Sequence, residues 1–252
     1  MLSEILKVAH LAGEKILEVY SQKNCDIKIK RDFSPVTQAD LISHECITKC
    51  LMELSKYPIV SEESCQDYEI RKNFDTFWLI DPLDGTKDFI AGNNQFTINI
   101  ALIENKEPIL GIIYAPALKL GYYAEKGKGA FLNGRSIFNT SKREKLIAAD
   151  SIFHSTTEAI NFLNRHEVHN IKRYGSAIKF GKLAEGDVDI YVRLNGSKEW
   201  DTAAGHIILK EAGCSIFGVS SKKEISYNKK FIENEHFIAV RTDLVDLYKK
   251  MI

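Results

Sequence analysis

The chain has 252 residues, of which 44% are hydrophobic and 27% are charged, and its 34 basic side chains balance 34 acidic ones. These values are typical of a globular protein with a sizeable core and argue against disorder. A net charge of zero provides no basic field that would attract nucleic acid or an anionic membrane.

Neither a membrane anchor nor a secretion signal is expected from the hydropathy pattern. No stretch is apolar enough for a transmembrane helix, and residues 1–7 carry charges in place of the apolar block of a signal peptide. We therefore expect a location in the cytoplasm, or peripherally at the inner face of the cell membrane, and no nucleic-acid partner.

The cysteine pattern points to reduced thiols. The five cysteines are Cys25, Cys46, Cys50, Cys65 and Cys214. Their number is odd and no Cys-x-x-Cys motif occurs, as expected for a cytoplasmic protein without a disulfide framework. Cys46 and Cys50 would share one helix face, and such a pair is more often part of a core than a ligand set.

Apolar spacing in the first half predicts two helices followed by strands. The helices are expected over residues 2–20 and, capped by Thr37, from there to residue 54. Ser34-Pro35 predicts a turn before the second helix, and Asn133-Gly134 predicts a hairpin turn. The expected strands are residues 27–29, 58–60, 77–80, 96–102, 109–114 and 121–124.

The second half mixes both kinds of element as well. Strands are expected at residues 147–153, 171–174, 188–193 and 237–240, and helices at residues 156–164, 175–184, 200–213 and 244–251. This mixture predicts an α/β (α+β) fold, built as a layered sandwich. We expect an amino-terminal part, residues 1–140, and a carboxy-terminal part, residues 141–252, packed as one compact unit.

Carboxylates recur where apolar elements end or begin. Glu62 follows a short strand, Asp81 and Asp84 end another strand around a proline, and Asp201 opens an apolar helix. Each has an ordinary alternative by itself, a surface loop for Glu62 or an N-cap for Asp201. Convergent carboxylates repel one another without a cation, and all-oxygen ligation favours Mg²⁺ over Zn²⁺.

Two further features adjoin these acids. The Gly85-Thr86 pair directly after Asp84 forms a turn whose backbone N–H groups are suited to binding phosphate. Asp40 lies in the first turn of the second predicted helix, where an acid either complements the helix dipole or contributes to a metal site. Both interpretations of Asp40 stay open.

Three motifs together resemble a known family. Ser61-Glu62-Glu63, the run Asp-Pro-Leu-Asp-Gly-Thr from Asp81 to Thr86, and the run Trp-Asp-Thr-Ala-Ala-Gly from Trp200 to Gly205 look like the signatures of the inositol monophosphatase superfamily. These enzymes are Mg²⁺-dependent, lithium-sensitive phosphomonoesterases. The resemblance spans nearly the whole chain and implies an αβαβα sandwich of the sugar-phosphatase type.

Within that superfamily the chain is most similar to the 3′(2′),5′-bisphosphate nucleotidases of the CysQ type. The run Gly-Thr-Lys-Asp-Phe-Ile after Asp84 and the run Gly-Ser-Ala-Ile-Lys-Phe from Gly175 to Phe180 fit that pattern. Lys179 stands where inositol monophosphatases commonly have an acid, and a lysine suits a second phosphate that does not react. The ordinary alternative is a solvated helix lysine. Gly181 departs from the cysteine common at that position.

The resemblance implies a role for each matched position. The implied metal ligands, for two or three Mg²⁺ ions, are Glu62, Asp81, Asp84 and Asp201 with their carboxylates and Leu83 with its carbonyl. The implied catalytic residues are Glu62 and Thr86, which orient the attacking water, and Asp40, which holds a further ion through water. The implied substrate-binding residues are Asp84, Gly85, Thr86, Ser176, Lys179 and Asp201.

The reaction implied is hydrolysis of the 3′-phosphate of adenosine 3′,5′-bisphosphate to AMP and phosphate, with the corresponding 5′-phosphosulfate as a further substrate, in connection with sulfate assimilation. One alternative is an inositol or sugar phosphate phosphatase. Another, from a different class, is a non-catalytic nucleotide- or metal-binding protein. The expected partner is a small phosphorylated molecule, and the sequence leaves open whether the protein is a monomer or a homodimer.

Overall fold

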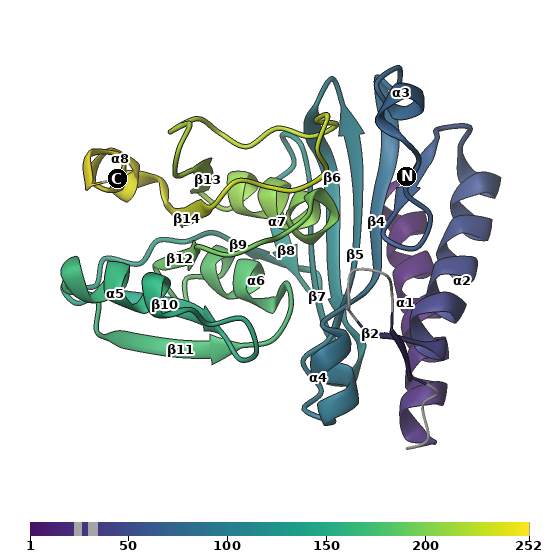
Figure 1. Cartoon of the computed structure of the whole chain (residues 1–252), viewed down its shortest axis with the longest axis horizontal. Helices are drawn as coiled ribbons and strands as arrows, with labels where there is room; N and C mark the ends of the chain where they lie inside the picture. The colour runs from purple at the N-terminus through teal and green to yellow at the C-terminus, as the bar shows by residue number, and fades with distance from the viewer. Residues whose placement is uncertain (23–26, 30–34, 252) are drawn as a thin grey trace.

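The computed structural model describes residues 1–22, 27–29 and 35–251, and their elements form five layers (Figure 1). Helices α1 and α2 cover one face of a seven-stranded sheet. Helices α6 and α7 lie between that sheet and a five-stranded sheet, and α5 and α8 cover the outer face of the second sheet (Figure 1). The predicted αβαβα layered sandwich is confirmed.

The elements have the following bounds. The helices are α1 (Leu2–Ser21), α2 (Gln38–Leu54), α3 (Tyr68–Arg71), α4 (Thr86–Ala91), α5 (Thr157–Arg165), α6 (Ile178–Ala184), α7 (Glu199–Glu211) and α8 (Val245–Met251), with 3₁₀ turns η1 (Pro116–Leu118) and η2 (Thr242–Leu244). The seven-stranded sheet has the order β3 (Ile59–Ser61), β4 (Thr76–Asp84), β5 (Thr97–Glu104), β6 (Glu107–Ala115), β7 (Leu120–Glu125), β8 (Ala130–Leu132), β9 (Arg135–Ile137). The five-stranded sheet has the order β11 (Asn170–Tyr174), β10 (Ile147–Ser151), β12 (Ile190–Arg193), β14 (Phe237–Arg241), β13 (Cys214–Gly218), and β1 (Ile27–Ile29) pairs with β2 (Pro35–Thr37).

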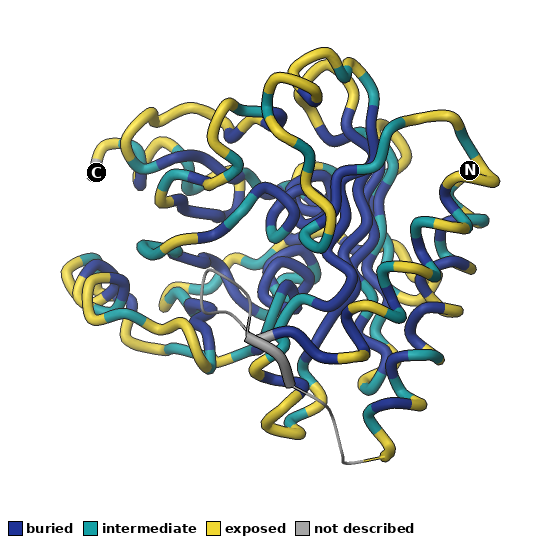
Figure 2. Tube along the Cα trace, turned by 45° about the vertical axis from the view of Figure 1, so that its right-hand side comes forward, coloured by how far each residue is buried: buried dark blue, intermediate teal, exposed yellow. Residues whose placement is uncertain are grey.

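Buried apolar side chains fill each space between layers. One cluster joins α1 and α2 to the seven-stranded sheet, a second surrounds α6 and α7, and a third lies under α5 and α8. Figure 2 shows the same division, since the central strands are buried and the outer helices are exposed on their outward sides. Helices α6 and α7 are therefore the elements that both sheets enclose.

A glycine allows α7 to approach the first sheet closely. A Cβ on Gly111 of β6 would lie 2.6 Å from the carbonyl oxygen of Ala204 and 2.5 Å from a methyl of Ile207. Such distances are too short for any real Cβ contact, so a larger residue at position 111 would push the helix away. The close approach matters because α7 also carries Asp201.

Most predicted elements are present, with differences at several boundaries. Asn133 and Gly134 both have positive φ and join β8 to β9 in a two-residue turn, as predicted. The strand predicted over residues 147–153 ends at Ser151, and the helix predicted from Gly175 begins at Ile178. Ser176 instead has a φ of 39° in the turn before α6.

The short elements that were not predicted include α3, α4 and β13. Helix α4 lies between the strands predicted at residues 77–80 and 96–102. Each of the three has at most six residues, which is too few for helical or alternating periodicity to emerge.

Several other expectations can be placed. Cys46 and Cys50 lie on α2 and pack against the apolar cluster beneath it, as predicted, whereas Cys25 and Ser34 lie outside the described residues. No helix in the described part of the chain is both long enough and apolar enough to span a bilayer. The division at residue 140 stays a prediction. Helix α7 of the second part packs on the sheet of the first part, so the two parts are in close contact.

Candidate active site

Strand β4 brings both acids of the central motif to one end of the seven-stranded sheet. Residues three apart on a regular strand point to opposite faces. Between Asp81 and Asp84 the register with β5 shifts, so that Asp81 pairs with Asn99 and Asp84 pairs with Thr97. The partners are two residues apart on β5 and share a face, so this β-bulge places both acids on the same side.

The turn after Asp84 depends on a glycine. Gly85 has a φ of +88° and precedes the first residue of α4. That left-handed conformation is strained for residues with a Cβ, and a Cβ on Gly85 would lie 3.0 Å from Cβ of Ser176. Glycine thus lets the turn and the loop before α6 approach each other closely.

A cavity of about 570 Å³ lies where these elements meet α6, α7 and β12. It is lined by nine of the ten residues to which the sequence assigned a role. These are Glu62, Asp81, Leu83, Asp84, Gly85, Thr86, Ser176, Lys179 and Asp201. The structure therefore gathers residues from distant parts of the chain around one space, and its volume suits a nucleotide-sized ligand.

Asp40 lies behind this cavity. One carboxylate oxygen accepts hydrogen bonds from the backbone N–H and the hydroxyl of Thr37, which completes a capping box on α2. The other oxygen accepts a hydrogen bond from the Thr86 hydroxyl at 3.2 Å. Asp40 therefore belongs to the capping box of α2 and is at the same time a partner of Thr86.

The cavity acids repel one another. Burial raises the pKa of Asp81 well above its usual value, and the charges of Glu62, Asp84 and Asp201 raise it further. Burial together with the charge of Asp84 raises the pKa of Asp201 to about 7. Burial also raises the pKa of Asp84, although Lys179 opposes that shift. Such mutual repulsion is relieved when a cation binds between the carboxylates.

Backbone and side-chain donors hold one oxygen of three of these carboxylates. Asp81 accepts from the Leu83 N–H at 3.1 Å, Asp84 from the Asn99 amide at 3.3 Å, and Asp201 from the Lys198 N–H at 2.8 Å. Within residues 1–22, 27–29 and 35–251, the second oxygen of each accepts no hydrogen bond. Hydrogen bonds that fix one oxygen and leave the other for a metal are usual around metal ligands.

The donor set fits a hard cation. Carboxylate and carbonyl oxygens are the preferred ligands of Mg²⁺. No three Asp, Glu, His or Cys side chains in the described part of the chain are already arranged to hold a metal ion. To bind a cation together, the carboxylates would therefore have to rotate toward a common point.

Lys179 provides a buried positive charge on another wall of the cavity. Its side chain is 3% exposed, so the interpretation as a solvated helix lysine is wrong. The ammonium group donates hydrogen bonds to the carbonyl oxygens of Ser176, at 2.5 Å, and Tyr174, at 3.3 Å. Burial lowers its pKa to about 8, although Asp84 opposes this shift, so that most of the group stays charged at neutral pH.

The sequence did not identify four further basic groups that line the cavity, Lys87, His154, Arg193 and Lys198. Burial and the charges of Arg193 and Lys87 lower the pKa of His154 to about 4, so its imidazole is neutral. The Arg193 Nε is buried and has no hydrogen-bond partner among the described residues. Arg193 could have been suspected, because it ends a strand in which charged and apolar residues alternate.

Comparisons with known proteins agree with this geometry. Residues 1–246 match the profile of the inositol monophosphatase family. Over 220 residues the chain is 39% identical to the 3′(2′),5′-bisphosphate nucleotidase CysQ of Salmonella typhimurium, which covers 86% of this chain and 89% of that protein.

Solved structures show the same fold. The crystal structure of CysQ from Bacteroides thetaiotaomicron has a TM-score of 0.85 and 35% identity, and the alignment covers 96% of this chain and 97% of that one. The IMPase of Thermotoga maritima has a TM-score of 0.83 and 29% identity, with 99% and 95% covered. The first of these is described as a bacterial member of the inositol monophosphatase family.

Proposed function

This chain belongs to the inositol monophosphatase family, and on that premise we propose that it is a Mg²⁺-dependent 3′(2′),5′-bisphosphate nucleotidase. It removes the 3′-phosphate of adenosine 3′,5′-bisphosphate and releases AMP and inorganic phosphate. The corresponding 5′-phosphosulfate carries the same 3′-phosphate and is a further substrate of the same site.

One observation supports this substrate above the others: the cavity contains two sets of opposite charge. Glu62, Asp81, Asp84 and Asp201 form an acidic set, and Lys179 and Arg193 belong to a basic set in the same space. A bisphosphate places its reacting phosphate, together with cations, at the acids and its second phosphate at the basic groups. Charge-assisted hydrogen bonds from a lysine and an arginine suit that second phosphate.

The acidic set would hold Mg²⁺ through the carboxylates of Glu62, Asp81, Asp84 and Asp201 and the carbonyl of Leu83. When bound, Mg²⁺ neutralises phosphate charge and lowers the pKa of an attacking water. Phosphate monoesters hydrolyse so slowly in water that charge neutralisation and positioning must supply most of the acceleration. Cys46, Cys50 and Cys214 do not line the cavity, so no thiol among them is placed to act as a nucleophile.

Asp40 orients the Thr86 hydroxyl so that its oxygen can accept a hydrogen bond from the attacking water. The Thr86 hydroxyl donates its proton to the Asp40 carboxylate, so its oxygen lone pairs remain to accept a hydrogen bond from the attacking water. The Glu62 carboxylate is the second acceptor. In this proposal Asp40 acts through Thr86, which differs from the ion-holding role inferred from the sequence.

The backbone holds the reacting phosphate. The N–H groups of Gly85 and Thr86 lie at the start of α4 and, in this proposal, donate to phosphate oxygens. Ser176 lies across the same turn, and its hydroxyl donates to the Gln95 carbonyl at 2.8 Å, which fixes the loop before α6. Loop and turn therefore form a rigid seat for the substrate.

The test is a comparison of kcat/KM for adenosine 3′,5′-bisphosphate and for inositol 1-phosphate, measured by phosphate release with saturating Mg²⁺. The proposal predicts a clear preference for the nucleotide. A preference for inositol 1-phosphate would assign the chain to the sugar-phosphate branch of the family. Absence of phosphate release from both compounds would support a non-catalytic binding protein.

A further inference from the structure

The segment between β13 and β14 contains residues 226–234, which we call the collar because they surround the first turn of α7. We propose that the collar positions Asp201 in the carboxylate set and that Asn234 is its main positioning residue. This role rests on the proposed function, since it concerns the cation that the carboxylates would hold. None of the collar contacts described below involves a residue to which a catalytic role was assigned.

Asn234 clamps the residues on either side of Asp201. Its side-chain NH₂ group lies within hydrogen-bond distance of the Lys198 carbonyl at 2.7 Å, the Thr202 hydroxyl at 3.1 Å and the Ser197 hydroxyl at 3.3 Å. Its backbone N–H donates to the Ser197 carbonyl at 2.8 Å. The side chain is 8% exposed, and Lys198 is also the residue whose N–H fixes the Asp201 carboxylate.

Glu199 attaches the collar to α7 from a second side. Its carboxylate is completely buried and accepts hydrogen bonds from the backbone N–H groups of Asn228, at 2.7 Å, and Lys229, at 2.9 Å. The Lys229 ammonium adds an ion pair at 2.9 Å, and the Glu199 N–H donates to the Ile232 carbonyl at 3.0 Å. A buried carboxylate satisfied in this way holds backbone more rigidly than a solvated loop would.

The collar also binds the first half of the molecule. The Asn228 amide donates to the carbonyl oxygens of Arg71, at 2.7 Å, and Phe74, at 3.2 Å. The Arg71 guanidinium donates in return to the Asn228 side chain and to the Lys230 carbonyl, both at 3.2 Å. Arg71 ends α3, which lies in the connection between β3 and β4.

These contacts explain how a site divided between two halves of the chain keeps its geometry. Glu62 begins the connection that carries Arg71, Asp81 lies near the end of the strand that follows this connection, and Asp201 lies on the helix that Asn234 clamps. The collar is hydrogen-bonded both to this connection and to the first turn of α7. A shift of the collar would therefore change the distance between Asp201 and the other carboxylates without altering any of those carboxylates.

The experiment compares Asn234→Ala with a matched variant, Asn139→Ala. Asn139 is similarly buried, at 6% exposed, and its amide also donates to two backbone carbonyls, those of Leu183 and Val188. It does not line the cavity. Both variants should lose thermal stability to a similar degree. The decisive readout is binding of Mg²⁺ alone to the substrate-free protein, measured by titration calorimetry.

Asn234→Ala should weaken Mg²⁺ binding about tenfold, as loss of a group that orients metal ligands does, and Asn139→Ala should leave the dissociation constant unchanged. Equal weakening in both variants, or no weakening in Asn234→Ala, would overturn the positioning role. Wild-type protein that binds no Mg²⁺ would overturn the proposed function and this role with it. Failure of the positioning role alone is distinguishable from failure of the proposed function, because in the first case the wild-type protein still binds Mg²⁺.

A milder pair of variants covers the case in which Asn234→Ala does not fold. Tyr227→Phe removes only the hydroxyl and leaves the buried ring in place; that hydroxyl donates to the Thr202 hydroxyl at 3.4 Å and lies 3.1 Å from Nδ1 of His206, which is also on α7. Tyr248→Phe is its control, another tyrosine that is 1% exposed and lies on α8. Tyr227→Phe should weaken Mg²⁺ binding measurably and Tyr248→Phe should not. Equal constants for the two would contradict the role of the collar.

Discussion

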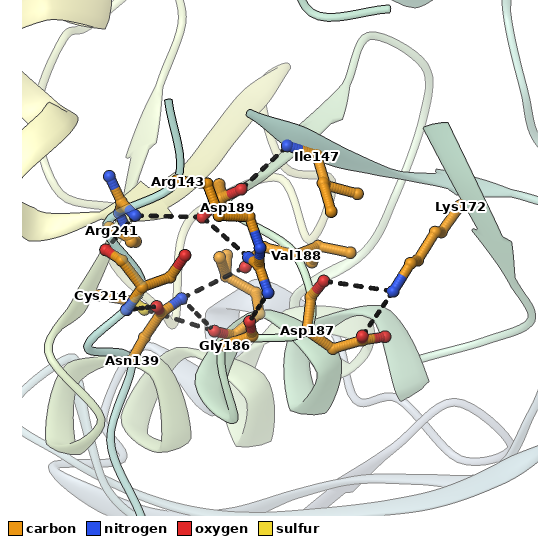
Figure 3. A network of polar contacts seen from close by, with 12 residues as sticks. Asn139, Arg143, Ile147, Lys172, Gly186, Asp187, Val188, Asp189, Cys214 and Arg241 are labelled. Atoms are coloured by element: carbon orange, nitrogen blue, oxygen red, sulfur yellow. Dashed lines mark hydrogen bonds and ion pairs between the residues drawn. The ribbon is translucent and has the colours of Figure 1, made fainter. Parts of the chain in front are cut away.

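Asp189 and Asp81 are both almost completely buried, at 0% and 2% exposed, but their neighbours carry opposite charges. The Asp189 carboxylate forms ion pairs with Arg241 at 3.1 Å and Arg143 at 3.2 Å, and it accepts the Ile147 N–H at 2.9 Å (Figure 3). The groups that act on the charge of Asp81 are other carboxylates. The first acid is neutralised by the fold, whereas the second lies among like charges, whose repulsion a bound cation would relieve.

The Asp189 network has a structural role. Figure 3 shows Asn139, Arg143 and Arg241 converging around Asp189 and Gly186, and Arg241 also donates to the Ser141 carbonyl. These contacts fix the connection between β9 and β10 to the five-stranded sheet. Neither Asp189 nor its two arginines line the cavity. Burial of an acid therefore does not identify a site by itself, whereas burial among like charges does.

Loss of a cavity acid should have the largest effect on activity. Asp84→Asn should lower kcat/KM for the nucleotide bisphosphate about 10³-fold or more. The reason is that a bound metal ion stabilises the charge of the transition state by several kcal/mol, and the variant would lose a ligand of that ion. The melting temperature of the metal-free variant should not fall, since Asn removes a repelling charge. Phosphate release and calorimetry measure the two quantities. A variant that turned over at the wild-type rate would show that Asp84 binds no metal.

Loss of Asp189, the acid paired with arginines, should lower stability and leave activity unchanged. Asp189→Asn removes the carboxylate of Arg143 and leaves Arg241 only its pair with the exposed Asp243. Breaking a buried ion pair costs about 3–5 kcal/mol of unfolding free energy. The folded fraction should keep its kcat and KM, because the network lies outside the cavity. Urea denaturation and phosphate release at low temperature test this. Full stability together with lost activity would remove the distinction between the two acids.

Lys179→Ala should affect one class of substrate. Without the buried ammonium, KM for the bisphosphate should rise about tenfold or more, as for loss of a hydrogen bond to a charged group, and KM for a monophosphate should rise less. Lys182→Ala is the control, because Lys182 lies on the same helix, pairs with Glu185 and does not line the cavity. Equal effects of Lys179→Ala on both substrates would exclude Lys179 from recognition of the second phosphate.

The smallest expected effect is a pH dependence of stability. The pKa of Asp201, raised to about 7 in the folded protein, means that folding favours the protonated form. Its contribution is favourable at low pH and is lost as pH rises from the usual value of 3.8 through about 7. In Asp201→Asn the side chain cannot ionise, so the variant does not lose stability in this way as pH rises. The melting temperature of the metal-free variant should therefore rise relative to wild type between pH 5 and pH 8.

Calorimetry in the presence of a chelator measures that difference. Each kcal/mol of relieved repulsion corresponds to about 2–4 °C in a chain of this size. The use of a difference between two proteins cancels the contributions of the titratable groups that both proteins share. A constant offset between variant and wild type across this range would show that Asp201 is not repelled by its neighbours.

The acids were predictable from the sequence because their signal is local. Glu62, Asp84 and Asp201 each stand at the end or the start of an apolar element, and an α/β fold brings such ends together. The layered fold was predictable for the same reason, from long periodic helices and strands. The β-bulge that aligns Asp81 with Asp84 was not, because hydrogen-bond register depends on the partner strand.

The basic set was not predictable, since its members owe their position to tertiary contacts. His154 follows β10 outside any helix or strand, so nothing local distinguishes it from a solvent-exposed residue. Arg193 ends β12, and the alternation along that strand is the one local signal for it. Lys179 was recognised only through family resemblance, and its burial follows from the packing of α6 between two sheets. The acidic residues of the cavity could therefore be predicted from sequence patterns more completely than the basic residues that are proposed to select the substrate.

The most direct test of the account is phosphate release from adenosine 3′,5′-bisphosphate by the purified protein, with and without Mg²⁺, and with the nucleotide product identified. The account predicts that release requires Mg²⁺ and that the product is AMP, because the 3′-phosphate reacts at the acids while the 5′-phosphate is held by Lys179 and Arg193. Release that is independent of Mg²⁺, or formation of adenosine 3′-phosphate, would contradict it.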